Sequence, residues 1–188
     1  LEGQKDIEKK TIRTTSSYSL KSDPLRILRA FRFAATLKFT IDEKTLKEIS
    51  INKDNIVVTA KERVWQEFFN FFSASNTGKL IRAMKETGLL LCLLPSPFPE
   101  WEKLSIHYNR LEHILLNMDS YFPGRKLNLP EKALIKFALL LKEIDSNPLE
   151  NTNNKNLGLP NTYEFLRSLK VSNKDITFIC KSIKNFHL

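Results

Sequence analysis

From residue 20 to the end of the chain, apolar side chains recur at the three- and four-residue spacing of amphipathic helices. Pro24 suits the first position of a helix, and either Ser22 or Asp23 is expected to cap it. The pattern therefore predicts a helix from this point to about Leu37. Its expected apolar face consists of Leu25, Leu28, Phe31 and Ala35, widened by Ile27, Ala34 and Leu37.

The same spacing predicts a helical fold for almost all of the remaining chain. Further helices are expected at 43–50 after an Asp42 cap, and at 61–74, 77–88, 101–121, 129–144, 162–169 and 173–185. The inward side chains of the 61–74 helix would be Val64, Phe68, Phe71 and Phe72. Residues 89–99 are expected to form a buried turn, and the Asn-rich residues 146–161 a solvated loop.

The first fifteen residues show no helix start. A short β-branched patch at 12–15 predicts one strand, the remnant of a sheet whose other strands are not part of the sequence. The predicted fold class is therefore all-α, in two successive groups of helices, with a strand remnant at the N-terminus.

Composition narrows the classes of function. The 188 residues carry a formal net charge of +9, which favours a polyanionic partner such as nucleic acid. Cys92 and Cys180 lie far apart and outside any metal-binding cluster, so we expect buried thiols in a reducing cytoplasm, without a disulfide or a zinc site. No apolar run reaches the length of a membrane span and no signal peptide is evident, so a cytoplasmic protein without a membrane partner is expected.

Asp23, Arg26, Arg29 and Arg32 follow one another in steps of three, which places them in a slowly turning row on one helix. A carboxylate only accepts hydrogen bonds and a guanidinium only donates them, so Asp23 and Arg26 form an acceptor and donor edge. Adenine and cytosine present the complementary edge, whereas guanine and uracil set a carbonyl against the carboxylate. The pair would select A and C, and the two later arginines would bind a triphosphate or an RNA backbone.

The same four residues also fit a simpler interpretation. Asp23 would only cap the helix, and the arginines would form a solvated face whose stems cover apolar surface. Charged helix faces of this kind are common.

The stretch from Asp23 to Thr45, DPLRILRAFRFAATLKFTIDEKT, resembles the signature of the bacterial tRNA nucleotidyltransferase and poly(A) polymerase family, class II, of the CCA-adding type. In that family a Glu-Asp-x-x-Arg motif opens the run. The resemblance implies that Asp23 and Arg26 contact the base of the incoming ATP or CTP, and that Arg29 and Arg32 belong to the nucleotide site. Ser22 stands where the motif commonly has Glu. Lys38 replaces the usual glycine, which would cost about 1 kcal/mol in a left-handed turn.

The resemblance extends to both sides of this stretch. Residues 1–14, with Gly3 and Asp6, are similar to the family's link between its catalytic head and its neck, and AKERVWQEF resembles a later neck motif. Glu62, Arg63 and Glu67 are therefore expected to support the nucleotide-reading helix, although they also fit a plain intrahelical pair. The implied domains are 1–18, the end of the head and linker; 19–98, the helical neck; and 99–188, the helical body.

The body resembles HD-type metal phosphohydrolases in a degenerate form. His113 matches a first metal ligand, but Lys142 and Glu143 stand where a His-Asp pair is expected. An ammonium has no lone pair for a metal, so no metal site is expected in this chain, and His113, like His107 and His187, would be an ordinary core or surface histidine.

The implied function is the nucleotide-selecting and RNA-binding part of a template-independent enzyme that adds CCA or A residues to RNA, with the tRNA acceptor stem as partner. Two Mg²⁺ ions would be held by the Asp-x-Asp carboxylates of the head, which nothing in this sequence matches, so this piece alone is expected to be inactive. A non-catalytic helical RNA-binding protein and an HD-type phosphohydrolase remain as alternatives. The sequence leaves the oligomeric state open.

Overall fold

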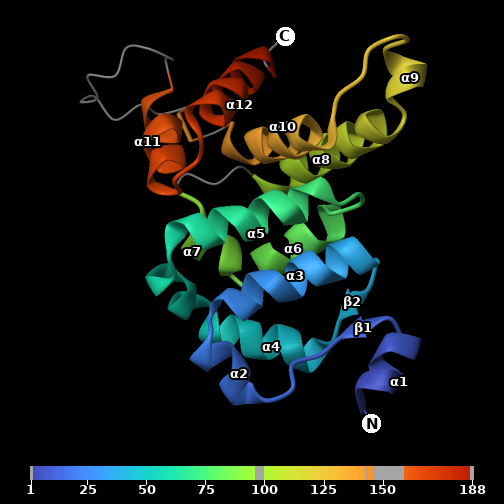
Figure 1. The fold of residues 1–188 in the computed structure, drawn as a ribbon, viewed down its shortest axis with the longest axis vertical. Coiled ribbons are helices and arrows are strands. Elements are labelled where there is room, and N and C mark those ends of the chain that lie inside the picture. Colours follow the sequence, from blue (N-terminus) through green and yellow to red (C-terminus); the bar gives the residue numbers. More distant parts are fainter. Residues whose placement is uncertain (1, 96–99, 143, 146–158, 187–188) are drawn as a thin grey trace. The chain divides into compact units, whose positions relative to one another are not determined.

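The computed structural model describes residues 2–95, 100–142, 144–145 and 159–186. They form two compact units, Leu1–Leu93 and Leu94–Leu188 (Figure 1). Helices dominate both units, which confirms the predicted all-α class. In the described part of the chain, no helix combines the length and the apolar character that crossing a membrane requires.

The first unit contains seven α-helices, one 3-10 helix and two short strands among its described residues. In chain order they are α1 (Glu2–Glu8), β1 (Thr11–Ile12), α2 (Ser17–Ser22), α3 (Leu25–Leu37), β2 (Thr40–Ile41), α4 (Glu43–Asn52), the 3-10 helix η1 (Lys53–Val58), α5 (Lys61–Ser73), α6 (Gly78–Glu86) and α7 (Leu89–Leu93). Helix α3 is central, because it packs against α2, α5, α6, η1 and both strands.

The core of this unit forms where α3 meets α5. The four inward side chains predicted for α5 are all buried, and two pairs of their rings pack at 5.0 and 5.9 Å between centroids. The predicted face of α3 is likewise buried, except that Leu37 is 50% exposed because it lies in the final turn. Both helices therefore follow their apolar patterns closely.

The predicted caps differ in outcome. Asp42 caps α4 as predicted, since its carboxylate accepts a hydrogen bond from the Thr45 backbone N–H at 3.3 Å. The predicted cap of α3 is wrong, because neither Ser22 nor Asp23 makes a side-chain capping bond there. Ser22 donates instead to the carbonyl of Ser19 at 3.1 Å.

The N-terminal segment differs most from the prediction. Residues 2–8 form helix α1, where no helix was expected, since Gly3 and several charged residues hide any apolar spacing. The short strand is present at Thr11–Ile12, and it pairs in parallel with β2, Thr11 opposite Thr40 and Ile12 opposite Ile41. The predicted remnant thus has a partner within this chain.

The described part of the predicted buried turn also differs. Residues 89–93 form the short helix α7, and Leu91 is 71% exposed; residues 96–99 lie outside the described part. Cys180 is buried as predicted, but Cys92 is half-buried, and its thiol donates to the Asp54 carboxylate at 3.3 Å.

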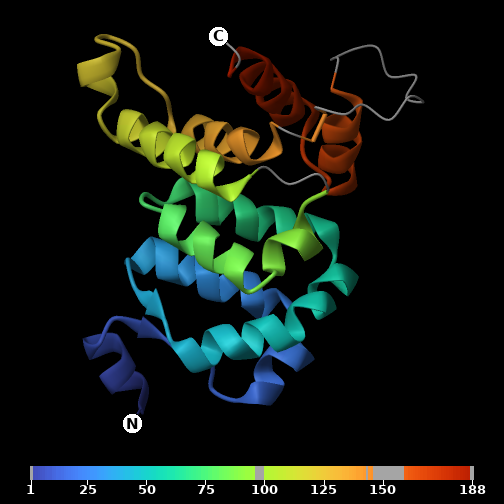
Figure 2. The ribbon, with the colours of Figure 1, turned by 180° about the vertical axis from the view of Figure 1, so that it is seen from behind.

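The second unit is built from α8 (Trp101–Leu116), α9 (Met118–Tyr121), α10 (Leu129–Leu141), α11 (Pro160–Ser168) and α12 (Asn173–Asn185). Helix α10 packs against α8 and α12, and α12 packs against α11 (Figure 2). The single helix predicted for 101–121 is interrupted at Asn117, whose side chain donates to the carbonyl of His113 at 2.8 Å. Most of the predicted loop, residues 146–158, lies outside the described residues.

Candidate functional site

The predicted acceptor and donor edge is present at the start of α3. Asp23 precedes the helix and Arg26 lies in its first turn, with 3.7 Å between the Asp23 Oδ2 and the Arg26 Nε. Their side chains are 31% and 50% exposed. Because Asp23 does not cap the helix, its carboxylate lies beside a guanidinium, and both groups remain accessible to a ligand.

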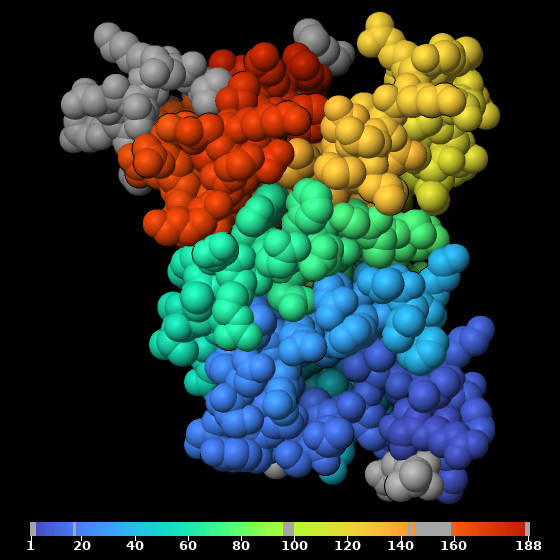
Figure 3. All heavy atoms as spheres, in the orientation of Figure 1, coloured from blue at the N-terminus to red at the C-terminus, as the bar shows by residue number. Residues whose placement is uncertain are grey.

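The next two arginines converge on one carboxylate of α5. The Glu67 Oε2 accepts from the Arg32 Nε at 2.6 Å, and the Glu67 Oε1 lies 4.0 Å from the Arg29 Nε. Glu67 therefore links α5 to two positions one turn apart on α3. In Figure 3 the outer surfaces of these two helices lie side by side on one face of the first unit.

The other two predicted supporting residues, Glu62 and Arg63, are exposed in the first turn of α5. Within the described residues, neither has an ion-pair partner closer than 4.0 Å. Glu67 thus has the position that bracing α3 requires, whereas support from Glu62 and Arg63 stays a prediction.

An exposed aromatic ring orients the same arginines. The guanidinium carbon of Arg32 lies 4.0 Å from the ring centroid of Phe33, and that of Arg29 lies 5.9 Å from it. A cation over an aromatic face is attracted by the ring quadrupole. Arg32 is therefore held between a carboxylate and an aromatic face.

A hollow of about 360 Å³ lies beside α3 within the first unit. We name it the arginine hollow; its polar and aromatic lining consists of Arg13, Thr14, Thr15, Ser19, Arg26, Arg29, Phe33 and Thr45. No carboxylate occurs among its described lining residues, and its volume falls in the range of small-ligand sites. Two of the four predicted nucleotide residues, Arg26 and Arg29, line it.

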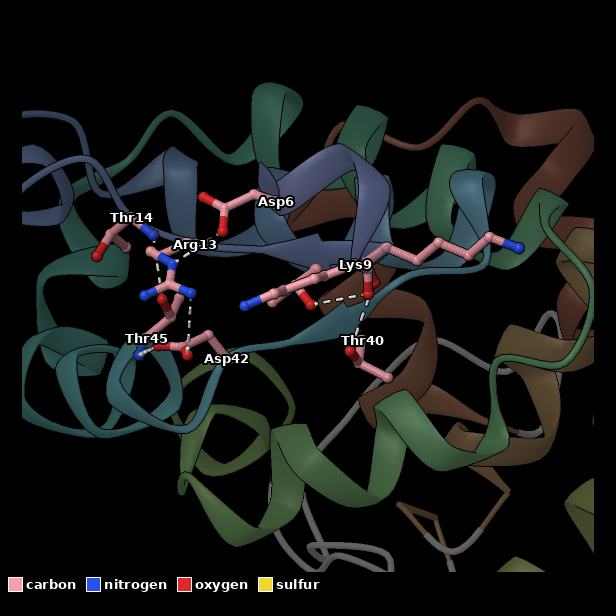
Figure 4. A network of polar contacts seen from close by, with 9 residues as sticks. Asp6, Lys9, Arg13, Thr14, Thr40, Asp42 and Thr45 are labelled. Atoms are coloured by element: carbon pink, nitrogen blue, oxygen red, sulfur yellow. Dashed lines mark hydrogen bonds and ion pairs between the residues drawn. The ribbon is translucent and has the colours of Figure 1, made fainter. Parts of the chain in front are cut away.

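Sequence reasoning missed Arg13, which lines the hollow from outside α3. Figure 4 shows its contacts: the Arg13 Nε lies 3.2 Å from the Asp6 Oδ1, and its Nη2 lies 3.9 Å from the Asp42 Oδ1. The next backbone N–H, that of Thr14, donates to the Thr45 hydroxyl at 3.0 Å. The sequence offered one signal for Arg13, an arginine among threonines in the patch predicted to form a strand. The pairing of β1 with β2, which the sequence did not predict, helps to place this segment beside α3.

The second unit holds a buried ion pair that the sequence did not reveal. The Lys136 Nζ on α10 donates to the Glu112 Oε1 on α8 at 3.3 Å, and the two side chains are 6% and 7% exposed. Burial lowers the pKa of Lys136, and the Glu112 carboxylate opposes this shift. This pair joins two helices in the interior, out of reach of a ligand.

The remaining predictions for the second unit concern metal ligands. His113 is exposed, and its ring packs edge-on against Tyr121 at 5.9 Å between centroids; His107 is also exposed. Glu143 and His187 lie outside the described residues. Across the described ranges, we find no group of three or more His, Cys, Asp or Glu side chains that would hold a metal ion.

Residues 38–100 match a family model described as "Probable RNA and SrmB-binding site of polymerase A". The matched segment begins at the end of α3 and includes β2, α4, η1, α5, α6 and α7. Most of the first unit thus has a recognised sequence pattern.

Curated relatives match over half of the chain or more. The chain is 41% identical to the "Multifunctional CCA protein" of Neisseria meningitidis over 95 residues, 50% of this chain and 22% of the relative. It is 31% identical to the "CCA-adding enzyme" of Buchnera aphidicola subsp. Cinara cedri over 146 residues, 74% of this chain and 35% of the relative. The match thus spans between about a fifth and a third of these relatives.

Solved structures share the fold over nearly the whole chain. A "tRNA-processing enzyme (apo form I)" superposes with a TM-score of 0.73 at 19% identity, over 97% of this chain and 45% of that one. A tRNA nucleotidyltransferase solved with a primer tRNA and an incoming ATP analog has a TM-score of 0.72 at 19% identity, over 98% of this chain and 48% of that one. The arrangement of helices therefore matches about half of a larger protein.

Proposed function

We propose that this chain belongs to the bacterial tRNA nucleotidyltransferase and poly(A) polymerase family, which its matches to CCA-adding relatives support, and that it is the part that selects the nucleotide and binds the RNA. The whole enzyme would add CCA or A residues to RNA 3′ ends without a template, with tRNA as its RNA substrate. The chain would contribute recognition, with the first unit as the neck and the second as the body.

One observation carries this proposal: the half-exposed Asp23 carboxylate lies beside the exposed Arg26 guanidinium, and Arg26 lines a hollow that has no acidic residue among its described lining residues. The Asp23 carboxylate would accept from the amino group of adenine or cytosine, and Arg26 would donate to the adjacent ring nitrogen. Guanine and uracil would leave the carboxylate facing a carbonyl oxygen, which costs a hydrogen bond and adds repulsion.

The arginines that follow would bind the phosphates of ATP or CTP. Arg29 lines the hollow. The hydrogen bond from Arg32 to Glu67 uses the Arg32 Nε. A guanidinium carries five N–H donors in a planar fork, so terminal Nη groups remain for phosphate oxygens. Glu67 and Phe33 would keep these forks oriented before the nucleotide arrives.

The RNA would be held largely through its phosphates. The chain has 30 Lys and Arg against 21 Asp and Glu, and the match to a model described as an RNA-binding site begins at residue 38. Phosphate contacts release counterions, so binding of a tRNA acceptor stem is expected to weaken as salt rises.

The chemical step is not assigned to this chain. Transfer of a nucleotide to a 3′ hydroxyl is served by two Mg²⁺ ions on paired carboxylates, and the sequence contains no Asp-x-Asp segment. This piece alone is therefore expected to bind nucleotide and RNA without joining them.

Competition binding of ATP, CTP, GTP and UTP against a fluorescent ATP analogue would test the proposal. We expect the chain to prefer ATP and CTP by about tenfold or more, the size of one unpaired polar contact. Asp23→Ala should remove the preference, and Arg26→Ala should weaken ATP and CTP, whose ring nitrogens accept from Arg26, more than GTP and UTP.

Asp119→Ala, which removes an exposed carboxylate in the second unit, serves as the matched control and should leave selectivity unchanged. An Asp23→Ala variant that still rejects GTP and UTP would contradict the assignment of base reading to Asp23.

A further inference from the structure

A second hollow of about 360 Å³ lies toward the C-terminal end of α3. Its walls come from α3, β2, α4, α6 and the turn between α5 and α6, all within the first unit. We name it the lysine hollow. At α3 and its C-terminal end, the lysine hollow is lined by Ala34, Ala35 and Lys38. The arginine hollow is lined instead by residues nearer the start of the same helix, such as Arg26 and Arg29.

The lysine hollow has an apolar floor and a cationic rim. Half-buried apolar side chains form the floor: Phe39, Ile41, Leu46, Leu80 and Ala83. Exposed residues form the rim: Lys38, Thr40, Asn76 and Lys79. No acidic residue occurs among the described lining residues, so the rim favours an anion and the floor favours a flat apolar group.

The backbone at the rim adds a second, independent observation. Lys38 and Asn76 have φ angles of 57° and 59°, in the left-handed region where glycine is free of strain. The Lys38 N–H closes α3 by donating to the carbonyls of Ala34 and Ala35, a role that needs no side chain. A lysine in this conformation costs free energy in the fold, as it does at Lys170, and Lys38 differs in that it lines the hollow, where its ammonium group can serve a ligand.

We propose that the lysine hollow binds one unpaired nucleotide of an RNA strand. The base would lie on the floor between Phe39 and Leu80, and Lys38 and Lys79 would hold the adjoining phosphate. All lining residues except Ala34 and Ala35 fall inside the segment that matches the model described as an RNA-binding site. This inference rests on the proposed function for its choice of RNA, and it adds a second nucleotide position on α3.

A protein partner would require a different surface. A docked helix or strand presents several apolar side chains, whereas this hollow offers room for one small group and surrounds it with ammonium and neutral polar groups. A nucleotide has both parts that the lining favours, a flat base and a negative phosphate.

Fluorescence anisotropy of a labelled, unstructured single-stranded RNA, titrated with salt, would test the proposal on the full chain. Lys38→Gly and Lys79→Ala should each weaken binding and reduce the slope of log K against log salt by about 0.7, the effect of one lost phosphate contact on a single strand. Ala83→Leu should weaken binding without changing the slope, because it fills the floor and removes no charge.

The chain offers a matched control in Lys170, another exposed lysine with positive φ, at 61° in the second unit. Lys38→Gly and Lys170→Gly both remove one charge and relieve the same backbone conformation, so both should raise the thermal midpoint. Only Lys38→Gly should weaken RNA binding, and loss of binding by a more stable variant excludes unfolding as the cause.

Equal RNA affinity for the Lys38 and Lys170 variants would overturn the inference and leave the proposed function standing. Absence of RNA binding by the unaltered chain at low salt would overturn both the inference and the RNA-binding role. In that case the nucleotide competition experiment would still test the arginine hollow separately. If the Lys38 and Lys79 variants capture a protein more weakly than the unaltered chain does, while their RNA affinity is unchanged, the hollow belongs to a protein partner and the proposal is rejected.

Discussion

The two units treat their charged groups in opposite ways. The second unit buries a complete ion pair, Lys136 with Glu112, between two packed helices. The first unit places Arg29 and Arg32 beside Glu67 at the edge of its core, where Arg29 is 44% and Arg32 20% exposed. A buried pair must stay complete, because each ion has lost its water, whereas a half-exposed arginine can exchange part of its contacts for a ligand.

A charge buried between helices serves the fold, whereas a partly exposed charge remains accessible to a ligand. The arginine hollow and the lysine hollow both belong to the first unit, and both contain cations and no acids among their described lining residues. The first unit therefore leaves positive charge accessible at its surface, while the second uses a buried cation to join helices. We therefore expect that breaking an ion pair lowers the free energy of unfolding more when the pair is more deeply buried.

The largest loss is expected in the second unit. Glu112→Ala leaves the Lys136 ammonium without its carboxylate in the interior, so the free energy of unfolding should fall by about 3–5 kcal/mol. Denaturant unfolding measures this loss. The double variant Glu112→Leu with Lys136→Met should recover most of it, since apolar residues can replace a buried pair. A Glu112→Ala variant as stable as the unaltered chain would contradict the expected link between burial and the cost of breaking a pair.

The next loss is expected where α5 meets α3. Glu67→Ala removes the carboxylate that accepts from Arg32 and lies 4.0 Å from the Arg29 Nε, and the free energy of unfolding should fall by about 1.5–3 kcal/mol, the range for hydrogen bonds to charged groups. Glu62→Ala, on the same helix and exposed, is the control and should change little. Equal losses from both variants would remove the special role of Glu67.

An alkaline titration probes another buried group of the second unit. Desolvation raises the pKa of the Cys180 thiol on α12 from 9.0 to about 11, and the negative charge of the Asp145 carboxylate adds to the shift. Between these pH values the unfolded thiol loses its proton while the folded one keeps it, so stability falls as pH rises. The loss should total about 2.7 kcal/mol at most.

Unfolding of the unaltered chain and of Cys180→Ala between pH 9 and 11 measures this effect. The variant should lack this part of the decrease, so the two stability curves should converge. Cys92→Ala is a comparison variant, because burial and the Asp54 carboxylate also raise the pKa of this half-buried thiol, so it should remove a part of the decrease in the same direction. Parallel curves for Cys180→Ala and the unaltered chain would contradict the prediction.

The smallest effect is expected for an exposed pair. Arg82 and Glu86 lie one turn apart on α6 with 3.6 Å between charged atoms, and their side chains are 65% and 67% exposed. Glu86→Ala should change the free energy of unfolding by about 0.3–0.5 kcal/mol, and added salt should reduce even this difference. A loss as large as that of Glu67→Ala would show that burial does not set the order.

Local pattern predicted the helices that carry strong apolar spacing. The inward faces of α3 and α5 and the Asp42 cap agree with the structure, because each depends on residues within about one helical turn. Helices α1 and α7 were missed, since the first has little apolar spacing and the second is apolar on every side.

The candidate site was predictable only in part. The neighbouring positions of Asp23 and Arg26 follow from helix geometry, and the structure places them 3.7 Å apart. The contribution of Arg13 to the arginine hollow depends on the pairing of β1 with β2, which joins segments far apart in sequence. No local rule specifies such a pairing for strands of two residues.

Spacing and composition were enough to establish the all-α class, the placement of Asp23 next to Arg26 at the start of one helix, and the excess of positive charge, because these are local properties of the chain. Three features emerged only on folding: which charges are buried, which carboxylate holds Arg32, and where the two hollows lie. They depend on how α3 packs against elements distant in sequence, and packing is a property of the whole unit.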